Sequence, residues 1–176
     1  MSIDSHDVAV VAAQLGRPPR SIHAVAHRCP CGNPGVVATE PRLDDGTPFP
    51  TTFYLTCPRA ASLIGTLEAS GLMREMSGRL AEDEDLAAAY REAHESYLAA
   101  REAIGEVPEI TGVSAGGMPD RVKCLHVLAG HALAAGPGVN PLGDEVLEAL
   151  GAWWANGPCV TAPQTSAAPD AAGQSS

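Results

Sequence analysis

The chain has 176 residues, of which 45% are hydrophobic and only 4% aromatic, and its formal net charge is −10 at pH 7. This length supports one domain with a substantial core, built mostly from Ala, Val and Leu. The negative charge argues against broad binding to nucleic acid or to anionic membranes, because both need an electropositive face. No apolar run approaches the roughly 20 residues that span a bilayer, and the acidic N-terminus is not a secretory signal. We therefore expect a cytoplasmic protein with reduced thiols.

The N-terminal third predicts one helix followed by a small sheet. Residues 5–15 carry an apolar stripe at helical spacing, with Ser5 as the expected N-cap and Gly16 as the stop. Three short segments then show strand composition and are separated by turn residues: 21–28, 36–39 and 51–56. Short turns favour an antiparallel meander, which we place at about residues 21–57.

The pattern is helical from Pro58 onward. Apolar residues recur at helical spacing over 58–80, 86–104, 119–136 and from Asn140. Acidic residues 82–85 are expected at the start of the helix 86–104, where they favour its dipole. Pro119 and Pro141 each suit the first position of a helix. The predicted fold class is α+β, with the meander packed against a bundle of about five helices.

Domain organisation follows from the end of the periodic pattern. Residues 1–156 read as a single α+β domain, and there is no internal repeat. Residues 157–176 are Gly, Pro, Ser, Ala and Thr with little else, and we expect a disordered C-terminal tail there.

The strongest functional signal is the segment Cys29-Pro30-Cys31, which lies beside a Gly-Asn-Pro-Gly turn. Residues two apart in an extended segment point the same way, so both sulfurs could face one ion. Cys57 ends the third strand, and the first and third strands of a meander can run side by side in the same direction. Their C-terminal ends, at Cys29 and Cys57, would then meet.

A fourth thiol is expected from the helix 119–136. In a regular helix Cys124 and His131 are about 10 Å apart along the axis, and Cys124 and His126 lie on roughly opposite sides. Cys124 is therefore expected to join without either histidine. The predicted metal ligands are Cys29, Cys31, Cys57 and Cys124, with zinc as the expected ion and an iron–sulfur cluster as the alternative.

Basic residues stand next to these cysteines in the sequence. Four thiolates on a divalent ion carry a net charge of about −2, and nearby cations would offset this charge or bind a cofactor. The candidates are Arg28, Arg59, Arg121 and Lys123.

Simpler interpretations compete with the metal site. A buried cysteine on a helix is often only a small core residue, and Cys159 in the tail is not expected to be a ligand. His131 and His126 are more typical of hydrogen-bonded core histidines than of catalysts. His27 shares a strand face with Cys29 and is an alternative ligand to Cys31.

Three long motifs resemble a bacterial family of unknown function, DUF501. They are RCPCGNPGVV followed by PRLDDGTPFPTTFYLTCP in residues 28–58, GMPDRVKCLHVLAGHALAAGPGVNPLGD in residues 117–144, and QLGRPPR in residues 14–20. The resemblance implies an actinobacterial cytosolic protein whose gene lies near a septum-formation initiator and an exopolyphosphatase. It assigns no activity. The family pattern emphasises the positions of Cys29, Cys57, Cys124 and His131 more than that of Cys31.

Three functional hypotheses follow. One is a metal-stabilised binding or regulatory module. Another is a protein that interacts with the division machinery. The remaining one is an enzyme acting on a phosphorylated or anionic substrate around Cys29 and Cys124, with Cys29 or His126 as nucleophile or base. Its anion clamp would be Arg28, Arg42, Arg59, Arg121 and Lys123. The chain lacks GxxxxGK[ST] and HExxH motifs, which weakens the enzyme hypothesis.

Overall fold

The computed structural model describes residues 1–161. Its helices are α1 (Ser5–Leu15), α2 (Pro58–Ala69), α3 (Leu72–Glu82), α4 (Glu84–Ile104), α5 (Leu125–Ala135) and α6 (Pro141–Leu150), with a short 3-10 helix, η1 (Pro108–Ile110). Its strands are β1 (Ile22–Arg28), β2 (Pro34–Thr39) and β3 (Phe53–Leu55). The expected α+β class, with a three-stranded antiparallel meander and a helical part, is confirmed.

The sheet has the order β1-β2-β3, so β2 lies between the other two strands. The expectation that the first and third strands could run side by side is therefore wrong. They do run in the same direction, because each is antiparallel to β2. Arg28 pairs with Pro34, and Leu55 pairs with Val36. The C-terminal ends of β1 and β3 therefore lie at the same end of the sheet, on either side of β2.

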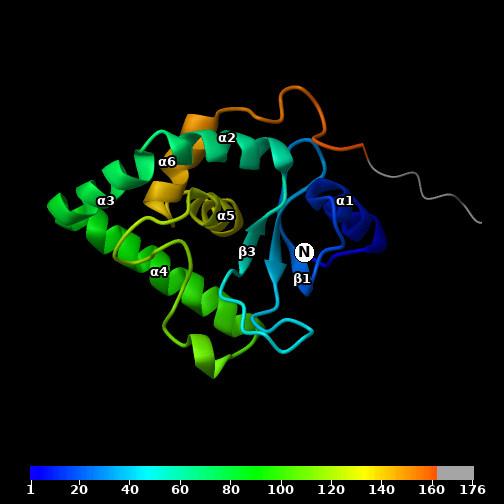
Figure 1. Ribbon diagram of the computed structural model, residues 1–176, viewed down its shortest axis with the longest axis horizontal. Helices are drawn as coiled ribbons and strands as arrows, with labels where there is room; N and C mark the ends of the chain where they lie inside the picture. The colour runs from blue at the N-terminus through cyan, green and yellow to red at the C-terminus, as the bar shows by residue number, and fades with distance from the viewer. Residues whose placement is uncertain (162–176) are drawn as a thin grey trace, which may run out of the picture.

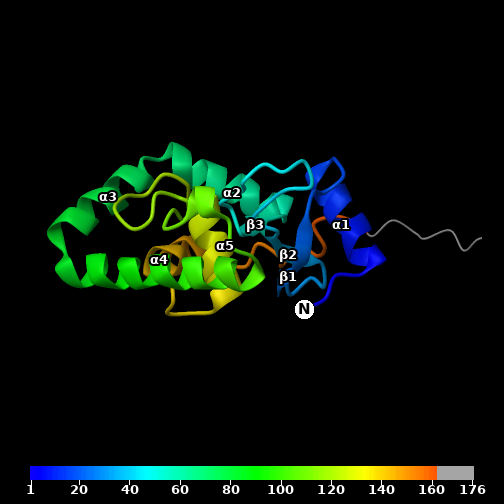
Figure 2. The same cartoon turned by 90° about the horizontal axis from the view of Figure 1, so that it is seen from below.

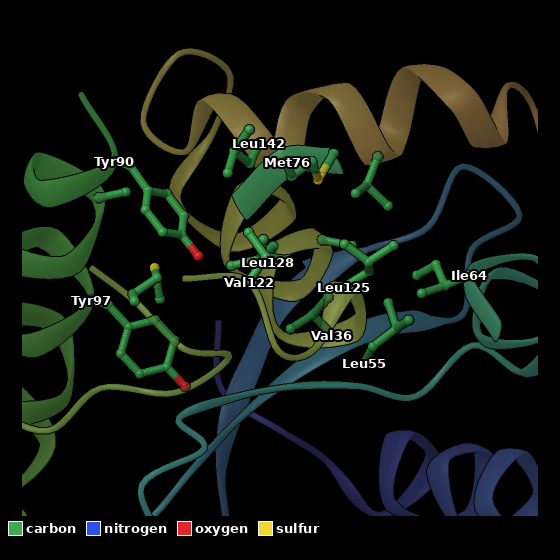
Figure 3. Close-up of a cluster of buried hydrophobic side chains, with 14 of the residues drawn as sticks. Val36, Leu55, Ile64, Met76, Tyr90, Tyr97, Val122, Leu125, Leu128 and Leu142 are labelled. Atoms are coloured by element: carbon green, nitrogen blue, oxygen red, sulfur yellow. The ribbon is translucent and has the colours of Figure 1, made fainter. Parts of the chain in front are cut away.

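Helix α5 is the centre of the molecule. Figure 1 shows it nearly end on, with α2, α3 and α4 around it and the sheet to one side. Figure 2 shows the long α4 crossing in front of it. The side chains of Leu125 and Leu128 on α5 are fully buried, and Figure 3 shows them among Ile64, Tyr90 and Leu142 from three other helices. This apolar cluster fixes the helices around α5 and against the sheet.

Local capping explains several boundaries. Asp4, not Ser5 as expected, is the N-cap of α1, because its carboxylate accepts a hydrogen bond from the Asp7 N–H at 2.8 Å. Gly16 ends α1 in the left-handed conformation. Asn140 is the expected N-cap of α6 and accepts from the Gly143 N–H at 2.9 Å.

One predicted boundary is wrong: the helix expected from Pro119 begins at Leu125. Side chains from other helices bind the backbone just before it. The Val122 N–H donates to Ser77 Oγ at 3.0 Å, and Tyr90 Oη donates to the Arg121 carbonyl at 3.1 Å. These hydrogen bonds compete with a helical turn, so residues 119–124 remain a loop.

The C-terminal segment crosses back over the domain as far as the structure describes it. The Arg59 guanidinium donates to the Gly157 carbonyl, and Asn33 Nδ2 donates to the Val160 carbonyl at 3.1 Å. Residues 157–161 of the predicted disordered tail are thus tied to the domain, and residues 162–176 lie outside the described residues. Within residues 1–161, no helix combines the length and the apolar surface that a bilayer crossing requires.

Candidate functional site

Two cysteines lie at the end of the sheet where strands β1 and β3 terminate. Cys29 follows β1 directly and is 4% exposed, whereas Cys57 is 2% exposed and is the N-cap of α2. Strand β2 lies between them, and the Thr56 N–H donates to the Gly35 carbonyl at 3.0 Å. Cys29 and Cys57 therefore lie at the same end of the sheet, and Cys57 is the last of the causes that raise the pKa of Cys29, after burial. The sequence-based grouping of these two residues is thus consistent with the fold.

A tight turn adds Cys31 to this pair. The Gly32 N–H donates to the Cys29 carbonyl at 2.8 Å, and the Cys29 N–H donates to the Asn33 carbonyl at 2.9 Å. Gly32 has φ 93°, a conformation that side chains disfavour, so the turn depends on this glycine. The turn folds Cys31 back onto Cys29, and each thiol shifts the pKa of the other.

The fourth neighbour is Cys159, which sequence reasoning had left in the tail. Its sulfur accepts a hydrogen bond from Gln14 Nε2 at 3.3 Å and lies 3.8 Å from Asn33 Nδ2. The Cys159 thiol raises the pKa of Cys57, and the Cys159 backbone N–H lowers that of Cys31. We call Cys29, Cys31, Cys57 and Cys159 the four-cysteine cluster; no three of their sulfurs lie within 4.8 Å of one another.

Burial and backbone dipoles oppose each other in this cluster. Burial is the main cause that raises the pKa of Cys29 to about 12 and also raises that of Cys57. For Cys31, burial acts upward, but the Asn33 N–H and the Cys29 thiol outweigh it, and its pKa lies below the ordinary value. The N–H groups of Ala60 and Arg59, at the start of α2, favour the Cys57 thiolate. Burial thus favours the protonated thiols of Cys29 and Cys57, whereas backbone N–H groups near Cys31 and Cys57 favour their thiolates.

Cys124 does not lie in the four-cysteine cluster. Its ligand atom falls within 4.8 Å of those of Glu68 and His126, and we call these three residues the Glu68–Cys124–His126 group. Glu68 is eleven residues beyond Cys57 on α2, which corresponds to about 16 Å along the helix axis. Thiolates that share one zinc ion are about 3.8 Å apart, as tetrahedral geometry and a Zn–S bond of about 2.3 Å require. The structure thus groups Cys124 with Glu68 and His126 and not with the other three predicted ligands.

The shift of the helix start explains why Cys124 and His126 converge. Cys124 is the N-cap of α5, with φ −153° and ψ 111°, and is therefore extended, not helical. The expectation that Cys124 and His126 point to opposite sides assumed a regular helix through both residues and fails for that reason. The Glu68 carboxylate completes the group, because its Oε1 accepts from the Leu125 N–H at 2.8 Å.

Cys124 and His126 also line a cavity of about 690 Å³ between β3 and the starts of α2 and α5. Its walls are mainly apolar and include Phe53, Leu55 and Val127. Burial and the Glu68 carboxylate raise the pKa of the Cys124 thiol. This thiol is therefore poorly suited to act as a free nucleophile, which needs the thiolate.

Three of the five candidate cationic side chains have partners within the described part of the chain. Arg28 forms a two-pronged ion pair with the Asp7 carboxylate, at 2.9 Å for each bond. Arg42 pairs with Glu109 at 2.7 Å, and Arg59 holds the Gly157 carbonyl. The other two, Arg121 and Lys123, are exposed. Arg28 and Arg59 thus fasten α1 and the C-terminal segment around the four-cysteine cluster.

Three further histidines, His131, His27 and His94, have neighbours typical of a structural role. His131 is fully buried, stacks on Phe53 at a centroid distance of 5.7 Å and lies 3.2 Å from Asn140 Nδ2. Burial is the main cause that lowers the pKa of His27, and a hydrogen bond with the Leu133 backbone partly offsets it. Nδ1 of His94 lies 2.8 Å from Ser114 Oγ.

Sequence reasoning missed Glu68, Gln14 and Cys159. Glu68 and Gln14 are single polar residues within amphipathic helices, and no motif links them to the cysteines. Cys159 offered one signal, since it is a cysteine in a segment otherwise rich in small and polar residues.

The comparisons with known proteins add a family but no activity. Searches of curated proteins and of solved structures gave no match. A family model described as "Protein of unknown function (DUF501)" matches residues 25–148, which include the Glu68–Cys124–His126 group and three members of the four-cysteine cluster. Since this match spans well over half of the chain, the protein belongs to the DUF501 family.

Proposed function

We propose that the protein is a metal-stabilised binding or regulatory module in which the four-cysteine cluster holds one zinc ion. The observation that carries the proposal is that cysteines from three distant segments come to the same end of the sheet: the turn after β1, the start of α2, and the C-terminal segment, whose Cys159 lies beside Asn33 of that turn. Relative to the set expected from sequence, Cys159 takes the place of Cys124.

The surroundings of the cluster suit a thiolate centre. Four thiolates on Zn²⁺ leave a charge of about −2, which needs hydrogen-bond donors nearby. Gln14 Nε2, Asn33 Nδ2 and the first N–H groups of α2 supply them. Binding would require the sulfurs, no three of which lie within 4.8 Å of one another, to close to about 3.8 Å.

A metal here would act as a structural pin. It would fasten the sheet edge, α2 and residues 157–161 to one point, and structural zinc supplies folding free energy directly. An iron–sulfur cluster on the same thiolates is the alternative. Thiolate ligands require a reducing compartment, which supports the proposed cytoplasmic location. The proposed link to cell division rests on family resemblance alone.

The test is metal analysis of the full chain purified without oxygen, together with its visible absorption spectrum. We expect Cys57→Ser and Cys159→Ser each to lose one equivalent of zinc and to unfold at a lower temperature, because one sulfur is replaced by a poorer ligand. A brown, visible-absorbing protein would indicate the iron–sulfur alternative.

Cys124→Ser is the matched control, since it is the same one-atom change outside the cluster and should leave this equivalent in place. The proposal is wrong if both cluster variants keep the full metal content of the wild type.

A further inference from the structure

We infer that the Glu68–Cys124–His126 group is a second, separate divalent-metal site, which takes zinc and leaves one coordination position open toward the adjacent cavity. Sulfur, imidazole nitrogen and carboxylate oxygen together are a typical zinc donor set. The three ligand atoms already lie within 4.8 Å of one another, and each residue is partly buried. In the described part of the chain, only these three residues reach such mutual proximity.

The hydrogen bonds of His126 support coordination through Nδ1. Nδ1 lies 3.1 Å from Glu68 Oε1, and Nε2 lies 3.1 Å from the Ala61 carbonyl oxygen. A metal-bound histidine typically donates its second N–H to a carbonyl or carboxylate, which fixes the ring. The Ala61 carbonyl is placed to accept that proton from Nε2 when Nδ1 binds the ion.

The hydrogen bonds of Glu68 leave it free to ligate. Its Oε1 accepts from Leu125 N–H at 2.8 Å and is near His126. The Cys124 thiol is a further hydrogen-bonding neighbour of this carboxylate. Glu68 can therefore hold the start of α5 with one oxygen and present the other to an ion.

Charge gives a reason for a dication at this point. A Cys124 thiolate beside the Glu68 carboxylate would place two negative charges within 4.8 Å of each other. Zn²⁺ with one thiolate, one carboxylate and one neutral imidazole is a centre of zero net charge, which suits a half-buried site.

The cavity distinguishes this site from the four-cysteine cluster. Cys124 and His126 line a space of about 690 Å³, and Glu68 is not part of its lining. Three protein ligands with a fourth position facing a cavity is the arrangement of zinc sites that bind an exogenous ligand. The cavity is large enough for a small molecule with an apolar body and one group that binds the metal.

Cobalt(II) is the probe for the experiment, because it replaces zinc and reports its ligands in the visible spectrum. The full chain is titrated with Co²⁺, and imidazole is then added. We expect a cobalt equivalent that persists in Cys57→Ser and whose spectrum changes when imidazole occupies the open position. Failure of the four-cysteine cluster to bind metal would leave this equivalent unaffected, so the two proposals are tested separately.

Three variants test the ligands. Cys124→Ser changes one atom, Glu68→Gln keeps an oxygen for the Leu125 N–H, and His126→Gln keeps a polar group near Ala61. Each should weaken cobalt binding at this site about tenfold or more. Far-ultraviolet circular dichroism verifies the fold.

The inference is overturned if the cobalt equivalent retains its affinity in all three variants, or if no such equivalent binds in the folded wild type. A cobalt spectrum that imidazole leaves unchanged refutes the open position.

Discussion

Lowering the pH from 7.5 to 5 should destabilise the protein through His131. Its side chain is fully buried between Phe53 and Tyr97, at centroid distances of 5.7 and 5.2 Å. Asn140 Oδ1 accepts from the Gly143 N–H, which turns Nδ2 of the same amide toward His131 Nδ1 at 3.2 Å. Nδ1 is therefore an acceptor, and a proton there would face a donor.

The magnitude follows from the pKa difference between the two states. Burial lowers the pKa of His131 from 6.5 to about 4 in the folded protein. Between these values the unfolded chain binds the proton and the folded chain does not, so stability is retained above about pH 6.5 and is lost as the pH falls toward 4. The difference amounts to about 2 kcal/mol at pH 5 and about 3 kcal/mol below pH 4.

Urea unfolding at several pH values, followed by circular dichroism, measures this loss. His131→Asn cannot titrate but keeps an oxygen acceptor for Asn140, so its stability should fall about 2 kcal/mol less than that of the wild type between pH 7.5 and 5. Leu128→Ala, one turn earlier on α5, is the control. It leaves a cavity that costs about 2–5 kcal/mol at every pH and should keep the wild-type pH dependence. Equal pH dependence in the wild type and His131→Asn would refute the reasoning.

Two further pairs of substitutions test the helix packing and the ion pairs. A Cβ at Gly143 would lie under 3.0 Å from atoms of α5, so Gly143→Ala should lower the free energy of unfolding by about 1–3 kcal/mol or more. A Cβ at Gly78 on α3 would have no atom within 4 Å, so Gly78→Ala should raise the free energy of unfolding by up to about 1 kcal/mol. Urea unfolding measures both. Equal effects would contradict the close approach of α5 and α6. The Asp7 carboxylate is 5% exposed and holds Arg28, so Asp7→Asn should cost about 1–3 kcal/mol at pH 7 in thermal or urea unfolding. Glu109→Gln, which breaks an exposed pair, should cost less than about 1 kcal/mol, and the reverse order would show that burial does not set these energies.

The sequence by itself determined the features that depend on neighbouring residues. The alternation and turns of residues 21–57 predicted the meander, because side-chain period and turn chemistry are local properties. Gly16 and Asn140 marked helix ends for the same reason, since a left-handed stop and an N-cap act within one turn. The segment Cys29–Cys31 and its turn were likewise visible in the sequence.

Tertiary structure alone decided which side chains meet. Helix α5 begins at Leu125 because Ser77, Tyr90 and Glu68, each on a different helix, bind the backbone before it, and no local signal encodes those contacts. That boundary turns Cys124 toward Glu68 and His126 and away from the four-cysteine cluster. Cys159 joins that cluster because the C-terminal segment is tied back across the domain. Long-range hydrogen bonds, absent from any short window of sequence, thus distribute the cysteines between two sites.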